Sequence, residues 1–425
     1  MASRGGVKVL LTEGSSSSAR QTLYGLDRYT VDILDPSPWC QCRFSRLVRR
    51  WYRCPSFSQS PGAYLRFLAD RILKGHYDVL FPTHEQVYLL ARFRDALQRR
   101  VGVALPSFEA LEQMQCKSSF ARLLQRLGLP APETQVIRNP AELAPATGFP
   151  CYLKLAHSTA GYGVRLVQDA EDLRNALADF EREGALAEES EVVVQQPARG
   201  IQGVAQSVFQ HGRLIAAHCS EAHDVGIGGG QMLRVSASHP MVIADLQKLG
   251  AHLHWHGALF VDYFYDAERE RVQYIEANPR IGETLSARIC GVNLCDLLVQ
   301  ISLGNQMEPV GPTEAGVWSH NGFQVLLARA LKGAGRRELI AECWRLIRKK
   351  GPYRGCQNEM TRPAEDWASL IPAFVVTFGL FANPRLADRI VRRTVENYSL
   401  PETAVQSIHE LPADLAEDFF RELAC

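Results

Sequence analysis

The segment that decides the fold is Gly257–Arg280, which reads GALFVDYFYDAERERVQYIEANPR. Two apolar runs, rich in aromatic and β-branched residues, flank a run of charged residues, and this pattern predicts two β-strands joined by a polar hairpin turn. Asp262 lies in the first strand. Glu276 and Asn278 lie two residues apart in the second, and side chains at that spacing project from the same face of a strand. The segment therefore predicts three oxygen-bearing side chains that converge on one side of a hairpin.

Carboxylate and amide oxygens are the ligands that Mg²⁺ prefers, and the ion usually completes its coordination with water and nucleotide phosphates. Asp262, Glu276 and Asn278 therefore form a candidate Mg²⁺ site, and Arg280 brings a permanent positive charge to the same region. The alternative is an exposed hairpin with ordinary surface charges. Against it, Glu276 lies between two apolar residues, where an unpaired carboxylate is costly.

The sequence E-A-N-P-R at 276–280, preceded by Asp262 in an H-G-x-x-F-V-D stretch, resembles the magnesium-binding signature of the ATP-grasp superfamily. The similarity is closest to the carbamoyl-phosphate synthase large-subunit-like, carboxylate–amine ligase branch. It covers residues 106–305 and, more loosely, residues 7–105. The resemblance implies that Asp262, Glu276 and Asn278 hold Mg²⁺, with Mn²⁺ as a substitute, between the phosphates of ATP. It also implies that Arg280 contacts the phosphate that is transferred.

The resemblance further implies an ATP site upstream, and suitable residues occur in the expected order. Lys117 opens a helix at the place of the family's first nucleotide-binding lysine. Lys154 lies in the strand PCYLKL at 150–155, where the family has its phosphate-binding lysine. The loop HSTAGYGV follows, and its glycines Gly161 and Gly163 allow backbone amides to approach phosphate oxygens. Each feature is weak alone, so the interpretation depends on their order.

The stretch VVVQQPA at 192–198 resembles the hinge strand of the family, which contacts the adenine edge. We expect Gln195, Gln196 and Ala198 to line that edge. Where the family usually has a glutamate that binds the ribose hydroxyls, this chain has Gln202. An amide can still donate and accept hydrogen bonds, but without the charge-assisted strength of a carboxylate.

A second glycine-rich loop, DVGIGGGQ at 224–231, leads to Arg234. The four glycines predict a mobile loop that orders over the acceptor substrate, with Arg234 as a contact for a carboxylate or for the acyl phosphate. An ordinary flexible crossover is the alternative.

Strand-like runs at 7–11, 30–34 and 77–81 alternate with helical stretches, and this alternation predicts a parallel sheet. A serine run at 15–18 replaces the glycine-rich loop of dinucleotide folds, so we do not expect NAD there. We expect an α/β and α+β protein in three parts: a Rossmann-like pre-ATP-grasp domain at 1–105, an ATP-grasp domain at 106–310 with a lid subdomain at about 150–195, and a mostly helical C-terminal region at 311–425.

The composition is that of a globular protein of 425 residues, 46% hydrophobic and 22% charged, which is long enough for several domains. A net charge of +1 gives no overall attraction to nucleic acid. The first residues lack the pattern of a secretory signal, and the 11 scattered cysteines favour reduced thiols. We therefore expect a cytoplasmic protein.

Two groups of residues have spacing that resembles metal ligands: Cys40, Cys42 and Cys54, and His252, His254 and His256. The cysteines lack a matching second pair. The histidines would share one face only in an extended chain, and the residues before them look helical. Zinc is therefore the minor alternative at both places.

An apolar run at 368–382, interrupted by Pro372 and followed by a basic stretch at 385–393, marks the C-terminal region. It is shorter than the roughly 20 residues that span a bilayer. We expect a buried helix. Contact of residues 368–393 with a membrane surface or a greasy substrate is the alternative.

Together these features predict an ADP-forming ligase. The carboxylate of a small molecule would attack the γ-phosphate of ATP, while Mg²⁺, Lys154 and Arg280 offset the developing charge. A small-molecule nucleophile, an amine, would then displace phosphate from the acyl phosphate under the lid. The alternatives are a bicarbonate-activating enzyme of the carboxylase or carbamoyl-phosphate type, and a non-catalytic nucleotide-binding scaffold. The sequence identifies neither substrate, and a homodimer is an open expectation.

Overall fold

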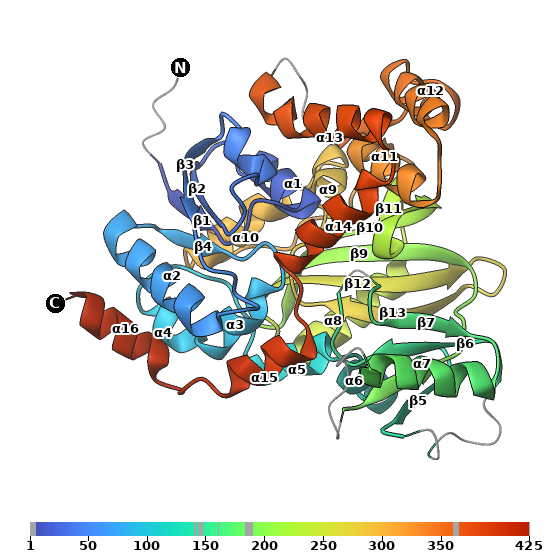
Figure 1. Ribbon diagram of the computed structural model, residues 1–425. Helices are drawn as coiled ribbons and strands as arrows, with labels where there is room; N and C mark the ends of the chain where they lie inside the picture. The colour runs from blue at the N-terminus through green and yellow to red at the C-terminus, as the bar shows by residue number, and fades with distance from the viewer. Residues whose placement is uncertain are drawn as a thin grey trace.

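Three β-sheets and the helices around them make up the computed structural model shown in Figure 1. The structure describes residues 6–139, 142, 148–159, 161–182, 190–359 and 365–424. Ala160 and residues 183–189, which belong to the predicted lid, lie outside the described residues.

The N-terminal sheet is parallel, as predicted, with strand order β3-β2-β1-β4. Its strands are β1 Lys8–Leu11, β2 Thr30–Asp35, β3 Val48–Arg53 and β4 Val79–Phe81. Its helices are α1 Ser17–Gly25, α2 Pro61–Gly75, α3 Gln86–Arg92 and α4 Arg94–Gln98, with a short 3₁₀ turn η1 at Gln41–Phe44. The sequence does not predict β3, because this edge strand reads VRRWYR and its side chains are partly or fully exposed.

The N-terminus of α1 is occupied by a carboxylate of the chain itself. Glu13 accepts hydrogen bonds from the backbone amides of Ser15 and Ser16, and the Ser16 hydroxyl donates to Glu13 Oε2 at 2.7 Å. Burial, together with the nearby Asp35, raises the pKa of Glu13 to about 8. A helix N-terminus attracts anions, and in dinucleotide folds it binds the pyrophosphate. Here Glu13 fills that position.

Two helices, α5 Phe108–Gln115 and α6 Lys117–Leu127, lead into a four-stranded antiparallel sheet of order β5-β8-β6-β7. Its strands are β5 Thr134–Ile137, β6 Cys151–Leu155, β7 Val164–Val167 and β8 Val192–Gln195. Helix α7, Ala170–Arg182, buries Leu173, Leu177 and Phe180 against Leu153 and Val194 of this sheet.

The central sheet has seven strands in the order β13-β12-β9-β10-β11-β14-β15. They are β9 Ile201–Gln210, β10 Arg213–Val225, β11 Gln231–Ala237, β12 Gly257–Asp266, β13 Arg271–Asn278, β14 Trp318–His320 and β15 Gln357–Asn358. The connecting helices are η3 Ile227–Gly229, α8 Pro240–His252, α9 Leu285–Ile289 and α10 Leu294–Ser302. The predicted hairpin is therefore confirmed as β12 and β13, which pair antiparallel.

A β-bulge interrupts this hairpin beside the predicted metal ligands. Asp262 lies opposite Glu276, but the next residue, Tyr263, lies opposite Tyr274, so that Ile275 is the extra residue. The bulge shifts the alternation of side chains along β13. Tyr274 consequently joins Tyr263 in the buried core against α8, while Glu276 stays on the opposite face with Asp262.

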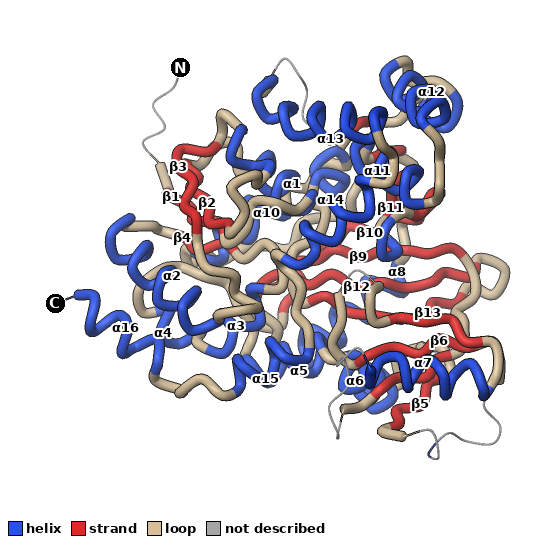
Figure 2. Tube along the Cα trace, in the orientation of Figure 1, coloured by secondary structure: helices blue, strands red, loops and turns tan. Residues whose placement is uncertain are grey.

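The C-terminal region extends the central sheet and also completes the N-terminal core. Its helices are α11 Gly322–Leu331, α12 Arg336–Ile347, η4 Gly351–Tyr353, η5 Trp367–Leu370, α13 Ile371–Ala382, α14 Leu386–Glu396, α15 Glu402–His409 and α16 Leu415–Ala424. Figure 2 shows that the chain returns from α14 so that α15 and α16 lie beside α2, α3 and α4. Val405, Ile408 and Phe420 are buried in one core with Leu65 and Leu68 of α2.

The prediction of a buried helix at 368–382 is wrong. Leu380 is the one buried residue of α13, whereas the side chains of Phe374, Val375 and Phe378 are 55%, 61% and 66% exposed. Because the run is apolar on every side, its sequence pattern does not indicate which side faces the protein. Among the described residues, no helix combines the length and the hydropathy needed to cross a membrane.

The two groups of candidate zinc ligands do not form metal sites in the described part of the chain. Its ten cysteines are free thiols, and no cluster of three or more His, Cys, Asp or Glu side chains there could hold a metal; Cys425 lies outside the described residues. His252 ends α8, His254 lies in a turn with φ +46°, and His256 stacks on His211 at 4.2 Å. The extended chain that the zinc alternative requires is therefore absent from 252–256.

Several shielded histidines, among them His218, His256 and His320, make the fold sensitive to acid. Burial lowers the pKa of His218 to about 3 and those of His256 and His320 to about 4. Below pH 6.5 the unfolded chain therefore binds protons that the folded chain does not, and the free energy of unfolding falls as the pH falls. Each ring contributes up to about 1.4 kcal/mol per pH unit.

We predict that His218→Asn reduces this dependence, because it removes one of the rings that take up a proton only on unfolding. Urea unfolding of the variant and of the wild type between pH 7 and pH 5 measures the slope. An unchanged slope would show that His218 is not held neutral by burial.

Candidate active site

A cavity of about 160 Å³ lies where all parts of the chain meet. The central sheet provides Asp262, Glu276 and Asn278, and the lid loop and the second glycine-rich loop provide its rim. The full lining comprises Ser18, His84, Thr159, Gly161, Val204, Gly228, Gly229, Gly230, Gln231, Arg234, Phe260, Asp262, Glu276, Asn278, Arg280, Gly282, Glu283 and Tyr398. Six of the thirteen predicted site residues thus line one cavity: Gly161, Arg234, Asp262, Glu276, Asn278 and Arg280.

The predicted metal ligands share one face of the hairpin. Asp262 lies opposite Glu276, and Asn278 Nδ2 donates to Asp262 Oδ2 at 3.1 Å. Burial raises the pKa of Asp262 to about 8, and the facing Glu276 carboxylate adds to the rise. Two carboxylates held side by side favour a bound cation, and these oxygen donors fit Mg²⁺.

Arg280 is fixed in place by two neighbours. Its Nε donates to Glu85 Oε1 at 3.0 Å, and its Nη2 donates to Asn278 Oδ1 at 3.1 Å. Glu85 is almost fully buried and follows β4 of the N-terminal sheet. Glu85, which follows the N-terminal sheet, therefore helps to orient Arg280 in the cavity.

The two predicted nucleotide lysines lie next to the hairpin, outside the residues that line the cavity. Lys117 Nζ is 3.1 Å from Glu276 Oε1 and donates to the Ser158 carbonyl at 3.0 Å. Lys154, on β6, is 6% exposed and donates to Gln195 Oε1 at 2.7 Å. Burial lowers the pKa of Lys154 to about 8. Both ammonium groups therefore lie near the predicted metal ligands, where phosphate oxygens would need positive charge.

The glutamines that we expect to contact adenine and ribose form hydrogen bonds with other parts of the protein. Gln195 holds Lys154 and donates to Thr134 Oγ1 at 3.0 Å, while Gln196 donates to the Gly148 carbonyl at 2.6 Å. Ala198 lies half-buried in the loop after β8. Gln202 Nε2 donates to the Gly229 carbonyl at 2.8 Å. Nucleotide contacts by these residues stay predictions.

The two glycine-rich loops meet at the cavity. Gly161 has φ +76°, and a Cβ atom there would lie 3.3 Å from Gly228 Cα. A Cβ atom on Gly163 would lie 2.5 Å from Ser158 Cβ, so a side chain at that position would displace the loop. Glycine is therefore required at 161 for its backbone conformation and at 163 for space.

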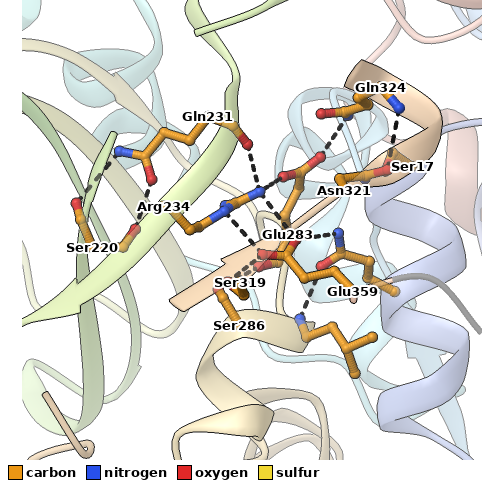
Figure 3. Close-up of polar contacts among 12 residues, drawn as sticks. Ser17, Ser220, Gln231, Arg234, Glu283, Ser286, Ser319, Asn321, Gln324 and Glu359 are labelled. Carbon is orange, nitrogen blue, oxygen red and sulfur yellow. Dashed lines mark hydrogen bonds and ion pairs between the residues drawn. The ribbon is translucent and has the colours of Figure 1, made fainter. Parts of the chain in front are cut away.

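Arg234 is held between two carboxylates, as Figure 3 shows. Its Nη2 forms an ion pair with Glu283, and its Nε lies 3.0 Å from Glu359 Oε1. Glu359 also accepts hydrogen bonds from Ser319 at 2.7 Å and from Gln21 at 3.1 Å. Arg234 is thus only 2% exposed, and its predicted contact with substrate stays a prediction.

Sequence reasoning misses the cavity residues that come from the N-terminal and C-terminal parts. The His84 and Tyr398 rings are in contact at 3.8 Å between centroids, tilted by 31°, and burial lowers the pKa of His84 well below its usual range. His84 follows the carboxyl end of a predicted parallel strand, where ligands commonly bind, and this position could have identified it. The sequence around Tyr398 gives no comparable indication, because the position of this residue beside the cavity depends on how the C-terminal tail packs. The tail also touches the lid, since Leu400 N donates to Thr159 Oγ1 at 3.4 Å.

Comparisons with known proteins identify a family that part of this chain resembles. Residues 116–310 match the family described as carbamoyl-phosphate synthase L chain, ATP binding domain. The carbamoyl phosphate synthase large chain of Thermus thermophilus is 26% identical over 218 residues, which are 48% of this chain and 21% of that protein. This chain therefore spans about a fifth of the length of that relative.

Two solved structures show the fold. An L-amino acid ligase from Bacillus licheniformis superposes with a TM-score of 0.54 at 17% identity, over 71% of this chain and 75% of that chain. A biotin carboxylase complex from Campylobacter jejuni superposes with a TM-score of 0.58 at 16% identity, over 71% and 72% of the two chains. The predicted ATP-grasp fold, with its parallel N-terminal sheet and C-terminal helices, is confirmed.

We predict that Lys154→Met weakens nucleotide binding by about tenfold or more, because it removes an ammonium group that would contact phosphate oxygens. Titration calorimetry with ADP and Mg²⁺ measures the dissociation constant. Lys74→Met, at a lysine that is 68% exposed on α2, is the control and should bind as the wild type does. Equal affinities of all three proteins would remove Lys154 from the nucleotide site.

Proposed function

We propose that this chain, in which residues 116–310 form an ATP-grasp domain of the carbamoyl-phosphate synthase L chain family, is an ADP-forming carboxylate–amine ligase. The observation that carries the proposal is the bulged hairpin, on which Asp262, Glu276 and Asn278 face one cavity beside two buried lysines. This arrangement supports phosphoryl transfer from ATP, because it gathers metal ligands and fixed positive charges around one small space.

In the proposed reaction a carboxylate oxygen of the substrate bonds to the γ-phosphorus of ATP, and the bond from that phosphorus to ADP breaks. An amine then bonds to the acyl carbon, loses a proton, and releases phosphate. Asp262, Glu276 and Asn278 would hold Mg²⁺, which supplies positive charge to the phosphate oxygens when it is bound. Arg280 would orient the transferred phosphoryl group, since Glu85 and Asn278 hold its guanidinium group in the cavity.

Residues outside the matched domain also line the cavity. Ser18 and His84 of the N-terminal part and Tyr398 of the tail complete the cavity wall, and none of them lies in 116–310. They could exclude water from the acyl phosphate and provide polar contacts to the amine.

Bicarbonate activation is the second candidate. The matched family supports it, and a cavity of about 160 Å³ can hold a one-carbon acid. A non-catalytic scaffold is less well supported, because Asp262, Glu276, Asn278 and Arg280 are all present and converge.

One screen distinguishes these functions. Phosphate release from ATP is measured with pooled carboxylic acids, with pooled amines and amino acids, and with both pools together. We expect release that requires both pools. Release that bicarbonate alone stimulates would replace the proposal with the second candidate, and binding of ADP without any turnover would favour the scaffold.

We predict that Glu276→Gln lowers turnover at limiting Mg²⁺ at least about 100-fold, because a neutral amide is a weaker ligand for a hard cation than a carboxylate. The variant should remain folded, since the two side chains have nearly the same shape, and a thermal unfolding curve checks this. Glu268→Gln, an exposed residue in the turn of the same hairpin, is the matched control. Near-normal activity of the Glu276 variant would refute the metal site.

A further inference from the structure

Apolar side chains are exposed together at one end of the molecule, on α12, η5 and α13. Of the 16 large hydrophobic residues that are exposed in the described part of the chain, half lie between residues 340 and 378. We define these eight as the α12–α13 face: Ile340, Trp344, Ile347, Trp367, Ile371, Phe374, Val375 and Phe378. Monomeric proteins rarely leave so many large apolar groups in contact with water unless they bind something.

The spacing of these residues gives each helix an outward apolar row. On α12 the row is Ile340, Trp344 and Ile347, and on α13 it includes Phe374 and Phe378, at intervals of three or four residues. The inward sides of both helices share a core that contains Leu339 of α12 and Leu380 of α13. Figure 1 shows the two helices along the same edge of the molecule.

Positive charge accompanies the α12–α13 face. Residues 336–354 contain seven Arg or Lys and two Glu, whereas the whole chain has a net charge of only +1. All seven basic residues are exposed: Arg336, Arg337, Arg345, Arg348, Lys349, Lys350 and Arg354. Of the two acids, Glu342 is 5% exposed and paired with Arg345. The other, Glu338, accepts a hydrogen bond from the Gly335 amide at the start of α12.

The basic and aromatic groups are interleaved. The Arg348 guanidinium lies 4.4 Å from the centre of the Trp344 ring, and that of Arg46 lies 5.7 Å from the centre of the Trp367 ring. Tryptophan, phenylalanine and arginine in this combination are typical of surfaces that insert rings below lipid head groups while cations contact the head groups.

We propose that the α12–α13 face docks on the surface of an anionic lipid membrane. The cations would meet the negative head groups, and the rings and aliphatic side chains would enter the boundary between head groups and acyl chains. Docking would be peripheral, because no described helix can cross a bilayer. A second copy of this chain fits less well, since a symmetric pairing would bring two strongly basic surfaces together.

The test uses the full-length protein in co-sedimentation with large vesicles. One set is pure phosphatidylcholine, and the other contains about one-third phosphatidylserine. We expect binding to the anionic vesicles at least about tenfold stronger than to neutral ones, and weaker binding as the salt concentration rises. Failure of the folded protein to bind the anionic vesicles would overturn the proposal.

Two variants and a control assign any binding to this face. Phe374→Ser with Phe378→Ser should weaken vesicle binding about tenfold or more, because the variant lacks two aromatic rings that would move from water into the lipid. Lys349→Glu with Lys350→Glu should remove most of the preference for anionic lipid. Trp39→Ser, at an unrelated side chain that is 77% exposed, should bind as the wild type does.

Unfolding midpoints are measured to check that each variant is folded. We expect each variant to be folded, because the substituted side chains are exposed. Binding that neither double variant weakens would overturn the proposal. The proposal would also be overturned if the wild type did not bind vesicles but formed a concentration-dependent dimer, measured by light scattering, that the double substitution Phe374→Ser with Phe378→Ser dissociates. The face would then join two copies of the chain. These readouts require no turnover, so their outcome is independent of the proposed ligase activity.

Discussion

The site depends on one electrostatic constraint, the placement of two carboxylates opposite each other on the hairpin beside the cavity. Asp262 and Glu276 face each other across β12 and β13, and burial and mutual repulsion raise the pKa of Asp262 to about 8. Such a pair is tolerated only near compensating charge. Lys117 supplies part of it directly, at 3.1 Å from Glu276, and Lys154 and Arg280 also lower the energy of the charged Asp262. The positive charges of Lys117, Lys154 and Arg280 are therefore needed to stabilise the two carboxylates at this place.

The same constraint explains why distant parts of the chain meet at the cavity. Arg280 needs a buried acceptor, and Glu85 after β4 provides it at 3.0 Å. Arg234 is nearly fully buried and is balanced by Glu283 and by Glu359, which lies directly after β15. Glu359 in turn accepts a hydrogen bond from Gln21 of α1. Removing one partner of such a network leaves a buried charge unpaired, so the N-terminal sheet, the central sheet and the C-terminal region are energetically coupled.

The sequence predicts the features that depend on neighbours along the chain. The hairpin, the shared side of Glu276 and Asn278, and the parallel N-terminal sheet all follow from local periodicity, and the structure has them. The bulge at Ile275 does not follow, because strict alternation would place Tyr274 on the same face as Glu276. The outward direction of α13 and the place of Tyr398 beside His84 also cannot be predicted locally, since both are decided by packing between segments far apart in the sequence.

Gln202 illustrates how the structure can explain a departure from a family pattern. The resemblance suggests a glutamate at this position. From the sequence alone, replacing that charged residue with a glutamine predicts a weaker contact with the ribose. In the structure the Gln202 amide donates a hydrogen bond to the Gly229 carbonyl at 2.8 Å. An ionised carboxylate has no proton to donate and would face the carbonyl oxygen with a like partial charge. Because Gly229 lies in the glycine-rich loop that borders the cavity, an amide at 202 can hold this loop where a glutamate would repel it. The substitution is thus consistent with a second task for this side chain, the positioning of the loop over the site.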